Sequence, residues 1–424
     1  MLNANSLRKV RQTVAGFSAL LLLNAFPLMP SAHAATAGTI IVCTQAGGDV
    51  ASAKKTLTDA GCTIVSEITC TTGNFSILEV RPNNGDVNGA VSKFSGTVDP
   101  NILSAEAKFQ SKAQWFCWPP RPTCVPNDPD YPSQYALANM NWNDARCTMR
   151  LLGISQRAYP RITLVDSGCN KIVAGDEMVN VQQFNFAGGP NGVPEATFDP
   201  GIHGTAVIGI AGARTNNSTF ISGVASHNLP VKVTSCRVSN DGVAIETIDV
   251  IRAMVWCVDH QVERGGPGII NLSVNSFGLP KYNGSPVFQE IGRLARKQGD
   301  LFVNASANEG LVDPSPEKNL RRILALDENN MVAPFSNTGP FKGAAPGVLI
   351  ATFDSPNTIA FGTGTSFACP NWAGTCALLM SLQPRMNAVR ADQIVYNTAD
   401  NTPEGYKLPN VNKAVIATLL FGWF

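Results

Sequence analysis

The sequence predicts an α/β fold, a mostly parallel β-sheet with helices on both faces, preceded by a small α+β domain. From Arg161 onward, short apolar runs alternate with Gly-rich turns and longer helical segments, as in successive strand–helix units. Residues 39–110 carry shorter strand and helix signals of their own, and a proline-rich stretch separates the two parts. The 424 residues, 44% of them hydrophobic, are enough to build both units.

Residues 1–34 have the features of a signal peptide. A basic start, an apolar stretch and a small-x-small cleavage site follow one another, at Arg8, Lys9 and Arg11, at Val14 to Leu23, and at Ala32-His33-Ala34. The apolar stretch is shorter than the roughly 20 residues of a spanning helix, so a removable leader is favoured over a membrane anchor. No later segment is long enough to span a membrane. The mature protein is therefore expected to be secreted, either to the exterior or to a bacterial periplasm.

Residues 35–113 form the predicted α+β domain. A helix is expected over residues 49–60, with Asp49 as its N-cap and Gly61 as its stop. A second helix is expected over residues 86–94. β-branched and apolar runs predict four strands, at residues 39–42, 63–68, 75–80 and 102–109. The residues alone leave open whether this is an ordinary accessory domain.

Residues 114–133 are predicted to be a linker and processing region. Six prolines make regular structure improbable here: Pro119, Pro120, Pro122, Pro126, Pro129 and Pro132. Exposed irregular segments are where proteolysis concentrates, so cleavage is expected near residues 110–117.

Residues 134–424 form the larger domain. Strands are expected at residues 162–165, 231–238, 268–274 and 301–305, and helices at 203–211, 245–258, 366–382 and 415–424. In such sheets, catalytic groups collect at the carboxyl ends of the strands. Polar residues directly after the strands are therefore the candidates for function.

Three short motifs supply the groups that acyl transfer by a serine needs. Asp166-Ser167-Gly168 follows a buried strand, His203-Gly204-Thr205 precedes an apolar helical run, and Gly364-Thr365-Ser366 opens a long helix. The hydroxyl needs a base to take its proton, and the base needs an acid to orient it. Each motif alone is common in turns and helix caps. The order Asp, His, Ser is one of the few chain orders that build a triad.

Ser366 carries the strongest single signal. The preceding glycines permit a tight turn, and a helix N-terminus favours developing negative charge. Pro370 is expected in the first turn of the helix, where proline is tolerated. Asn308, soon after the strand at 301–305, could donate its side-chain amide to an oxyanion together with the N–H of Ser366.

These motifs resemble those of the subtilisin-like serine proteases, the subtilase family. The segment from Gly364 to Pro370 matches the family pattern Gly-Thr-Ser, apolar, Ala, variable, Pro position by position. The resemblance covers about residues 125–415. It implies a secreted serine endopeptidase that uses Ser366 as nucleophile, His203 as general base and then acid, Asp166 as orienter and Asn308 in the oxyanion hole.

The resemblance also implies a role for residues 35–113. By position, size and pattern they resemble the family's propeptide, which helps the catalytic domain to fold and then inhibits it as its partner. The alternative for the whole chain is a catalytically inactive relative that acts as a binding protein. The presence of all four chemical residues argues against that alternative.

A polypeptide substrate is expected to bind as an added β-strand, as in the family. One wall of its site corresponds to Ser273, Val274 and Asn275, where Asn275 replaces the family's usual glycine. Ala307 likewise replaces the glycine that usually precedes the oxyanion asparagine. Both changes would add bulk near the primary specificity pocket, so substrate preference stays open.

The chemistry requires no cofactor. A net charge of +1 gives no argument for a nucleic-acid partner, and the absence of paired CxxC motifs argues against a zinc site. Calcium often stabilises the family, and Gln134 is the one candidate ligand by its position.

The eleven cysteines fit an exported protein, because oxidising compartments permit disulfides. Eight of them lie at or after Cys117, and their pairing cannot be derived from the sequence. Cys169 and Cys369 lie close to the motifs, either in disulfides or as buried thiols. Cys376 lies two helical turns beyond Cys369, too far to bond to it.

Overall fold

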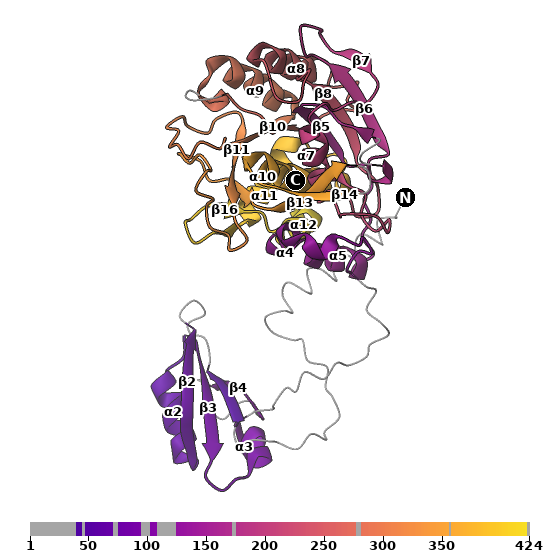
Figure 1. Ribbon diagram of the computed structural model, residues 1–424. Coiled ribbons are helices and arrows are strands. Elements are labelled where there is room, and N and C mark those ends of the chain that lie inside the picture. Colours follow the sequence, from indigo (N-terminus) through magenta and orange to yellow (C-terminus); the bar gives the residue numbers. More distant parts are fainter. Residues whose placement is uncertain are drawn as a thin grey trace. The chain divides into compact units, whose positions relative to one another are not determined.

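The structure is a computed structural model, and it describes residues 40–44, 47–70, 75–94, 102–107, 124–171, 175–276, 281–355 and 358–421 (Figure 1). The chain divides into two compact units, Met1–Pro119 and Pro120–Phe424. The predicted signal peptide and the linker up to residue 123 lie outside the described residues.

The first unit is a four-stranded antiparallel sheet in the order β2-β3-β1-β4, with two helices. Buried Leu57 of the first helix and Phe94 of the second pack against Leu78 and Val80 of the sheet. Asp49 caps the first helix, accepting the N–H groups of Ala51 and Ser52 at 2.9 and 3.2 Å. All predicted elements of this unit are present: β1 Ile40–Thr44, α2 Val50–Asp59, β2 Cys62–Cys70, β3 Phe75–Pro82, α3 Val87–Phe94 and β4 Ile102–Ala107.

The second unit contains an eight-stranded sheet in the order β12-β11-β10-β9-β5-β8-β6-β7, parallel except at the β6–β7 edge. Its strands are β5 Arg161–Asp166, β6 Asn180–Asn185, β7 Val193–Glu195, β8 Lys232–Arg237, β9 Ile269–Leu272, β10 Leu301–Ala305, β11 Arg321–Leu326 and β12 Ala344–Pro346. A hairpin of β13 Ile350–Ser355 and β14 Thr358–Gly362 and a short pair, β15 Asp400–Asn401 with β16 Lys407–Leu408, complete the strands. The predicted mostly parallel sheet is confirmed.

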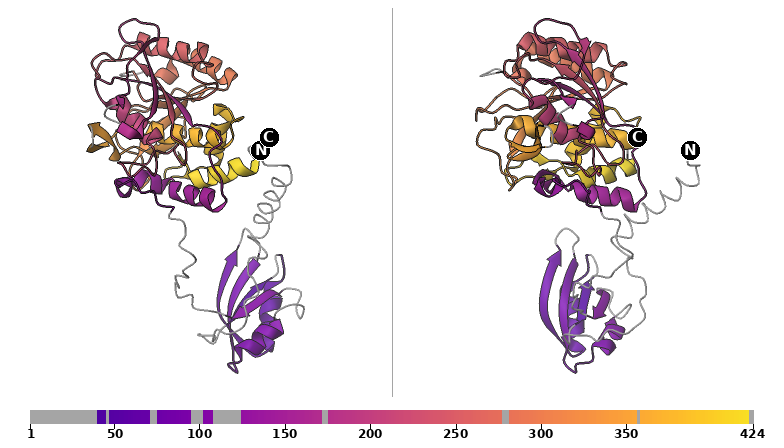
Figure 2. Two further views of the ribbon diagram at one scale, coloured as in Figure 1. Left: turned by 90° about the vertical axis from the view of Figure 1, so that its right-hand side faces the viewer. Right: turned by 45° about the vertical axis from the view of Figure 1, so that its right-hand side comes forward.

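Helices cover both faces of this sheet (Figures 1 and 2). Ile270 and Phe302 pack with Met254 and Phe288 on one face. Their strand neighbours point the other way, and Val303 packs in the cluster around the buried helix α10. The helices are α4 Tyr135–Asn139, α5 Trp142–Leu151, α7 His203–Gly212, α8 Thr247–Asp259, α9 Pro286–Gln298, α10 Thr365–Leu382, α11 Ala388–Thr398 and α12 Val411–Phe421, with single 3₁₀ turns at Tyr131–Ser133, Gly175–Glu177 and Tyr282–Gly284.

One disulfide is present among the described residues, between Cys124 and Cys147, and it ties the start of the second unit to α5. The other described cysteines with placed side chains are free and buried, namely Cys62, Cys169, Cys236, Cys257, Cys369 and Cys376. Cys169 and Cys369 could have been in disulfides or buried thiols, and in the structure both are buried thiols. Burial raises the pKa of the Cys169 thiol to about 12, so it stays protonated at neutral pH.

Candidate active site

Asp166 and His203 meet at the carboxyl edge of the sheet. Strand β5 ends at Asp166, helix α7 begins at His203, and the His203 Nδ1 lies 2.7 Å from the Asp166 Oδ1. The carboxylate is fully buried, whereas the imidazole keeps 32% of its side chain exposed. Because an ionised carboxylate can only accept, Nδ1 carries the proton, and Nε2 is left as the basic nitrogen.

The small residue after the histidine makes this approach possible. A Cβ on Gly204 would lie 2.1 Å from the carbonyl oxygen of Gly168, a separation no side chain tolerates. Any larger residue at Gly204 would push α7 away from the loop after β5. Gly204 therefore permits the close packing of the two motifs around the Asp166–His203 contact.

A second buried carboxylate, Asp199, joins the two motifs and was not predicted from the sequence. Its Oδ1 accepts the Ser167 hydroxyl at 2.8 Å. Its Oδ2 accepts both the N–H and the hydroxyl of Thr205, each at 2.7 Å. Ser167 in turn accepts the N–H of Gly204 at 2.9 Å. The only feature of the local sequence that could have indicated Asp199 is its place in the turn four residues before His203.

The surroundings of His203 set its basicity. Desolvation lowers the pKa of the imidazole, but the charge and hydrogen bond of Asp166, with the charge of Asp199, outweigh it. The pKa of His203 is therefore raised above its ordinary value. A carboxylate that raises the pKa also stabilises the imidazolium that forms when the ring takes a proton.

Ser366 lies in the first turn of α10, one residue after the helix begins at Thr365. Helices α7 and α10 pack together inside the unit (Figure 1). Phe367, next to Ser366, presents its ring to the imidazole of His203 at a right-angled contact, with ring centroids 5.8 Å apart. The residue next to the predicted nucleophile therefore contacts the ring of the predicted base.

Asn308 is held with its amide nitrogen free to donate. Its Oδ1 accepts the N–H and the hydroxyl of Thr365, at 2.8 and 2.9 Å, so the amide can lie only one way round. A Cβ on Gly364 would lie 3.2 Å from the Ser366 Oγ and 3.3 Å from the Asn308 Nδ2. The Ser366 hydroxyl and the Asn308 amide nitrogen therefore both lie next to the α-carbon of Gly364, which carries no side chain.

Pro370 lies in the second turn of α10, so the expected first-turn position was wrong. In a regular helix the N–H of residue 370 would bond to the carbonyl of Ser366, and proline has no N–H to give. That carbonyl instead accepts the hydroxyl of Ser273 at 2.9 Å. Proline therefore leaves an acceptor free, and a residue of the predicted substrate wall takes it.

The other predicted wall residues lie beside this contact. The Asn275 side chain donates to the carbonyl of Ala305 at 2.8 Å and accepts the N–H of Tyr282 at 3.1 Å, so it braces the loop after β9. Val274 is half-buried and packs against the core beneath α8 and α9.

Two residues that directly precede predicted site residues have left-handed backbone. Ala307, directly before Asn308, has φ 81°, and Ile202, directly before His203, has φ 59°. Ala307 is held there by its N–H to the Thr365 hydroxyl at 3.1 Å and by its carbonyl, which accepts the Asn337 N–H at 3.0 Å. Such backbone costs energy in residues with a Cβ and tends to occur at functional sites.

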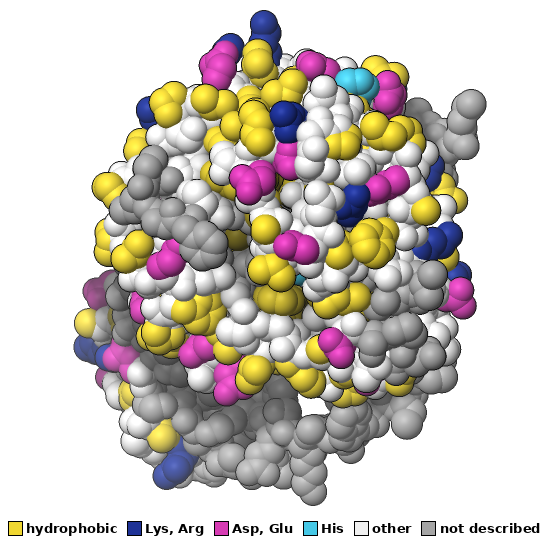
Figure 3. Space-filling model, turned by 45° about the horizontal axis from the view of Figure 1, so that its top comes forward, with side chains coloured by type: hydrophobic (Ala, Val, Ile, Leu, Met, Phe, Trp, Pro, Cys, Tyr) yellow, Lys and Arg dark blue, Asp and Glu magenta, His cyan; other side chains and the backbone are white. Residues whose placement is uncertain are grey.

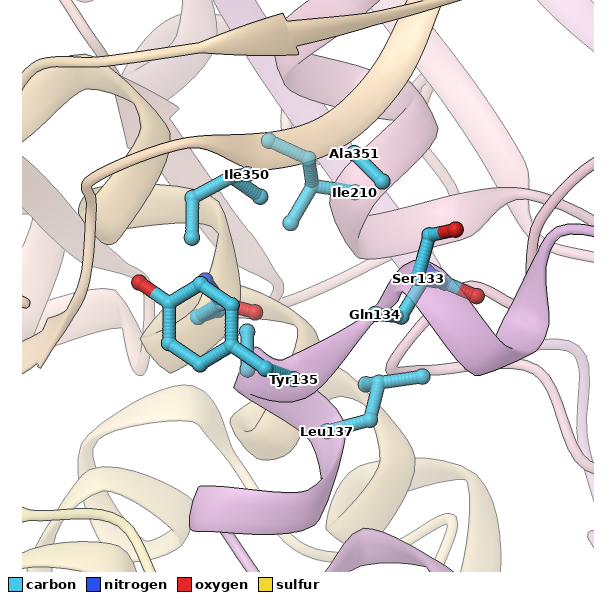
Figure 4. A pocket seen from close by; sticks show the side chains of 9 residues that line it. Ser133, Gln134, Tyr135, Leu137, Ile210, Ile350 and Ala351 are labelled. Carbon is cyan, nitrogen blue, oxygen red and sulfur yellow. The ribbon is translucent and has the colours of Figure 1, made fainter. Parts of the chain in front are cut away.

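Gln134 lines a small pocket beside Tyr135, Ile210 and Ile350 (Figure 4). Its amide donates to the carbonyl of Ser222 at 2.8 Å and accepts the same residue's N–H at 2.7 Å. Across the described residues, no three His, Cys, Asp or Glu side chains gather as a metal site. A calcium site at Gln134 therefore stays a prediction.

On the face shown in Figure 3, the basic and acidic side chains of the described residues are scattered among apolar ones. In the part of the chain that the structure describes, no helix combines the length and apolarity needed to cross a membrane.

Comparison with known proteins assigns the family. The model of the subtilase family matches residues 160–415. The thermophilic serine proteinase of Bacillus sp. (strain AK1) is 27% identical over 371 residues, which are 86% of this chain and 82% of that protein. Thermitase of Thermoactinomyces vulgaris is 28% identical, over 65% of this chain and 92% of its own.

Solved structures agree on the fold. A protease from Pseudoalteromonas arctica superposes with a TM-score of 0.57 at 21% identity, over 69% of this chain and 99% of that one. The epidermin leader peptide processing serine protease of Staphylococcus aureus gives 0.55 at 18% identity, over 89% and 97%. The chain is a member of the subtilase family, the subtilisin-like serine proteases.

Proposed function

We propose that this protein is a secreted endopeptidase that hydrolyses peptide bonds through an acyl-enzyme. The observation that carries the proposal is the buried Asp166 carboxylate bonded to His203, beside a hydroxyl and an amide donor that share the space over Gly364. The relative from Bacillus sp. (strain AK1), a serine proteinase by its name, supports the same reaction class.

In the proposed reaction, the Ser366 Oγ attacks the carbonyl carbon of the substrate while the Nε2 of His203 takes the hydroxyl proton. The carbonyl oxygen becomes an oxyanion that accepts from the Asn308 Nδ2 and the Ser366 N–H. His203 then gives the proton to the amine nitrogen as the oxyanion collapses and the C–N bond breaks, which leaves the acyl group on Ser366. Water, deprotonated by the same nitrogen, then attacks the acyl carbon; the bond from that carbon to the Ser366 Oγ breaks, and His203 returns the proton to Oγ.

The Asp166 carboxylate keeps the imidazole in the tautomer that this sequence of steps needs, and it stabilises the imidazolium between them. The substrate is proposed to bind as an extended strand beside Ser273, Val274, Asn275 and Ala307. The Ser273 hydroxyl donates to the backbone carbonyl of Ser366, so this wall lies directly beside the proposed nucleophile.

The first unit is proposed to be the propeptide of a self-inhibited precursor, and residues 1–34 its export signal. Its compact antiparallel sheet with two helices has its own core, which supports an independently folding element. Structural calcium remains part of the proposal, and loss of thermal stability on chelation would test it.

The experiment is the intact mass of the wild type and of Ser366→Ala after export. The proposal predicts that the wild type shortens near residues 110–117, while the variant loses only residues 1–34. If both keep the first unit, self-processing is wrong. If both shorten equally, another protease makes the cut, and hydrolysis must be measured on a peptide substrate.

A further inference from the structure

Two free thiols meet where helix α8 packs on the sheet of the second unit. Cys236 lies in strand β8 and Cys257 in α8, and their Sγ atoms are 3.9 Å apart. Both side chains are fully buried in the apolar cluster that also contains Val165 and Trp256. Two ligands are too few for a zinc site, and no third His, Cys, Asp or Glu joins them among the described residues.

The separation of the two sulfurs is close to that of a disulfide. Bonded sulfurs lie about 2.0 Å apart, so each Sγ would have to move by about 1 Å, which a small rotation about each Cα–Cβ bond supplies. The two cysteines are 21 residues apart in the chain, and a strand and the helix packed on it hold them in place. Cys369 differs, because its thiol donates to the carbonyl of Val303 at 3.1 Å.

The pair lies next to the strand end that carries the proposed orienting acid. Cys236 directly precedes Arg237, which is opposite Asp166 in the parallel register of β5 and β8. The N–H of Val238 donates to the carbonyl of Asp166 at 2.9 Å. A covalent bond between Cys236 and Cys257 would therefore tie α8 to the strand that flanks Asp166.

We propose that Cys236 and Cys257 are joined by a further disulfide in the exported protein. This rests on the export that is part of the proposed function, because oxidising compartments permit disulfides. One such bond, Cys124–Cys147, is already present.

The oxidant in this step is a disulfide of the export compartment, carried by a small thiol compound or by a thiol oxidoreductase. The thiolate of one cysteine attacks a sulfur of that disulfide and forms a mixed disulfide. The thiolate of the other cysteine then displaces the oxidant's sulfur. Two electrons and two protons pass from the cysteines to the oxidant, which leaves with two thiols.

The bond has to form before the second unit has finished folding. In the folded chain neither sulfur is exposed, and burial raises the pKa of the Cys236 thiol well above its ordinary value. The thiolate that must attack is therefore scarce once α8 has packed on the sheet. The same burial then keeps reductants away from the finished bond, so the disulfide is a permanent tie made during folding.

The test is a peptide map of the full chain carrying Ser366→Ala, which prevents self-digestion, after export to a bacterial periplasm. The protein is denatured, alkylated without reductant and cut with trypsin. The disulfide predicts one linked species, residues 233–237 joined to residues 253–264, which separates into two peptides on reduction. If these two peptides each carry an alkyl group while Cys124 and Cys147 are linked, the proposal is wrong.

The Cys124–Cys147 bond distinguishes this failure from failure of the proposed function. If that bond is also absent from the exported chain, the chain has not met an oxidising compartment, and the export part of the proposed function fails. Refolding of the same chain from urea in a buffer of reduced and oxidised glutathione then decides between the linked and the alkylated peptides.

Thermal unfolding of chains refolded with and without reductant gives a second readout. Reductant should lower the Tm of the Ser366→Ala parent by about 5 °C or more beyond its effect on a variant that also carries Cys236→Ala and Cys257→Ala. That variant keeps the contribution of Cys124–Cys147. Cys376→Ala, which removes a fully buried thiol from α10, is the matched control and should respond as the parent does. An equal response of the parent and the Cys236→Ala, Cys257→Ala variant would overturn the proposal.

Discussion

Asp199 accepts both the N–H and the hydroxyl of Thr205, two residues after His203, at 2.7 Å each. The contact fixes the first turn of α7, and Asp199 is also bonded to Ser167 in the loop after β5. A single buried carboxylate thus contacts both elements that supply the proposed orienting acid, Asp166, and the proposed base, His203. Its charge also helps to raise the pKa of His203.

Asp199→Asn should shift the pH dependence of the reaction. Without this negative charge the pKa of His203 falls, and catalysis needs the neutral imidazole. The acid limb of kcat/KM should therefore move to lower pH. An amide nitrogen would also face donors at Thr205 or Ser167, so the free energy of unfolding should drop by about 1–3 kcal/mol.

The measurement is a pH–rate profile of kcat/KM, with Glu290→Gln as the control because it removes an exposed carboxylate from α9. An unmoved acid limb in Asp199→Asn would mean that Asp199 acts on structure alone.

Gly364→Ala should abolish most activity, through the added methyl and through the strain of a Cβ at φ 155°. The added methyl would lie 3.2 Å from the Ser366 Oγ and 3.3 Å from the Asn308 Nδ2, so both groups must shift. Small displacements of reacting groups cost about 10²-fold in rate. Gly268→Ala is the control, because the nearest atom to its added methyl is 3.8 Å away. Steady-state kinetics measure the activity of both variants, and far-UV circular dichroism checks their fold. A fully active Gly364→Ala would refute the placement of the reacting groups beside Gly364.

Ala307→Gly should stabilise the protein. The left-handed backbone at φ 81° costs about 1–2 kcal/mol for a residue with a Cβ, and the entropy of glycine offsets part of the gain. A net increase of about 0.5–1 kcal/mol is expected from urea unfolding in the Ser366→Ala background, which prevents self-digestion. A loss of stability would show that Ala307 is not strained.

Glu177 should make the protein less stable as pH rises. Its carboxylate is buried, and desolvation raises its pKa from 4.5 to about 8, although Thr219 and Asn217 donate to it at 3.0 and 3.2 Å. Between those two pH values the folded state holds a proton that the unfolded state has released. Stability is therefore present below about pH 4.5 and is lost as pH rises through about 8.

Glu177→Gln should remove that loss, worth more than about 1.4 kcal/mol at about pH 8.5 relative to about pH 5. Urea unfolding at the two pH values, again in the Ser366→Ala background, measures it. If the free energy of unfolding changed equally with pH in wild type and variant, Glu177 would not be the group responsible.

Much of the site could be predicted because the strands that lead to it have clear sequence patterns. The apolar, β-branched runs before Asp166 and Asn308 place both at the carboxyl edge of a parallel sheet. Glycine before Ser366 marks the tight entry to α10. These signals are local in the sequence, and the strands and the helix that they predict are present in the structure.

The missed features depend on tertiary contacts. The place of Asp199 in the turn before His203 does not by itself show that it bonds to residues 167 and 205. Helix α5 reads as polar, yet Arg146 is buried because its guanidinium bonds to the Cys124 carbonyl and lies 5.1 Å from the Trp142 ring. Helix α9 was missed for another reason, because its sequence does carry ordinary helix signals. Pro286 stands at its start and Gly299 at its end.

The central claim is that Ser366 is an activated nucleophile, and labelling by an organophosphorus fluoride tests it most directly. The processed wild type and Ser366→Ala would be treated side by side, and the modified residue located by mass spectrometry of the digested protein. We predict one added group on Ser366 in the wild type and none in the variant. An unlabelled wild type, or the same label in Ser366→Ala, would contradict the account.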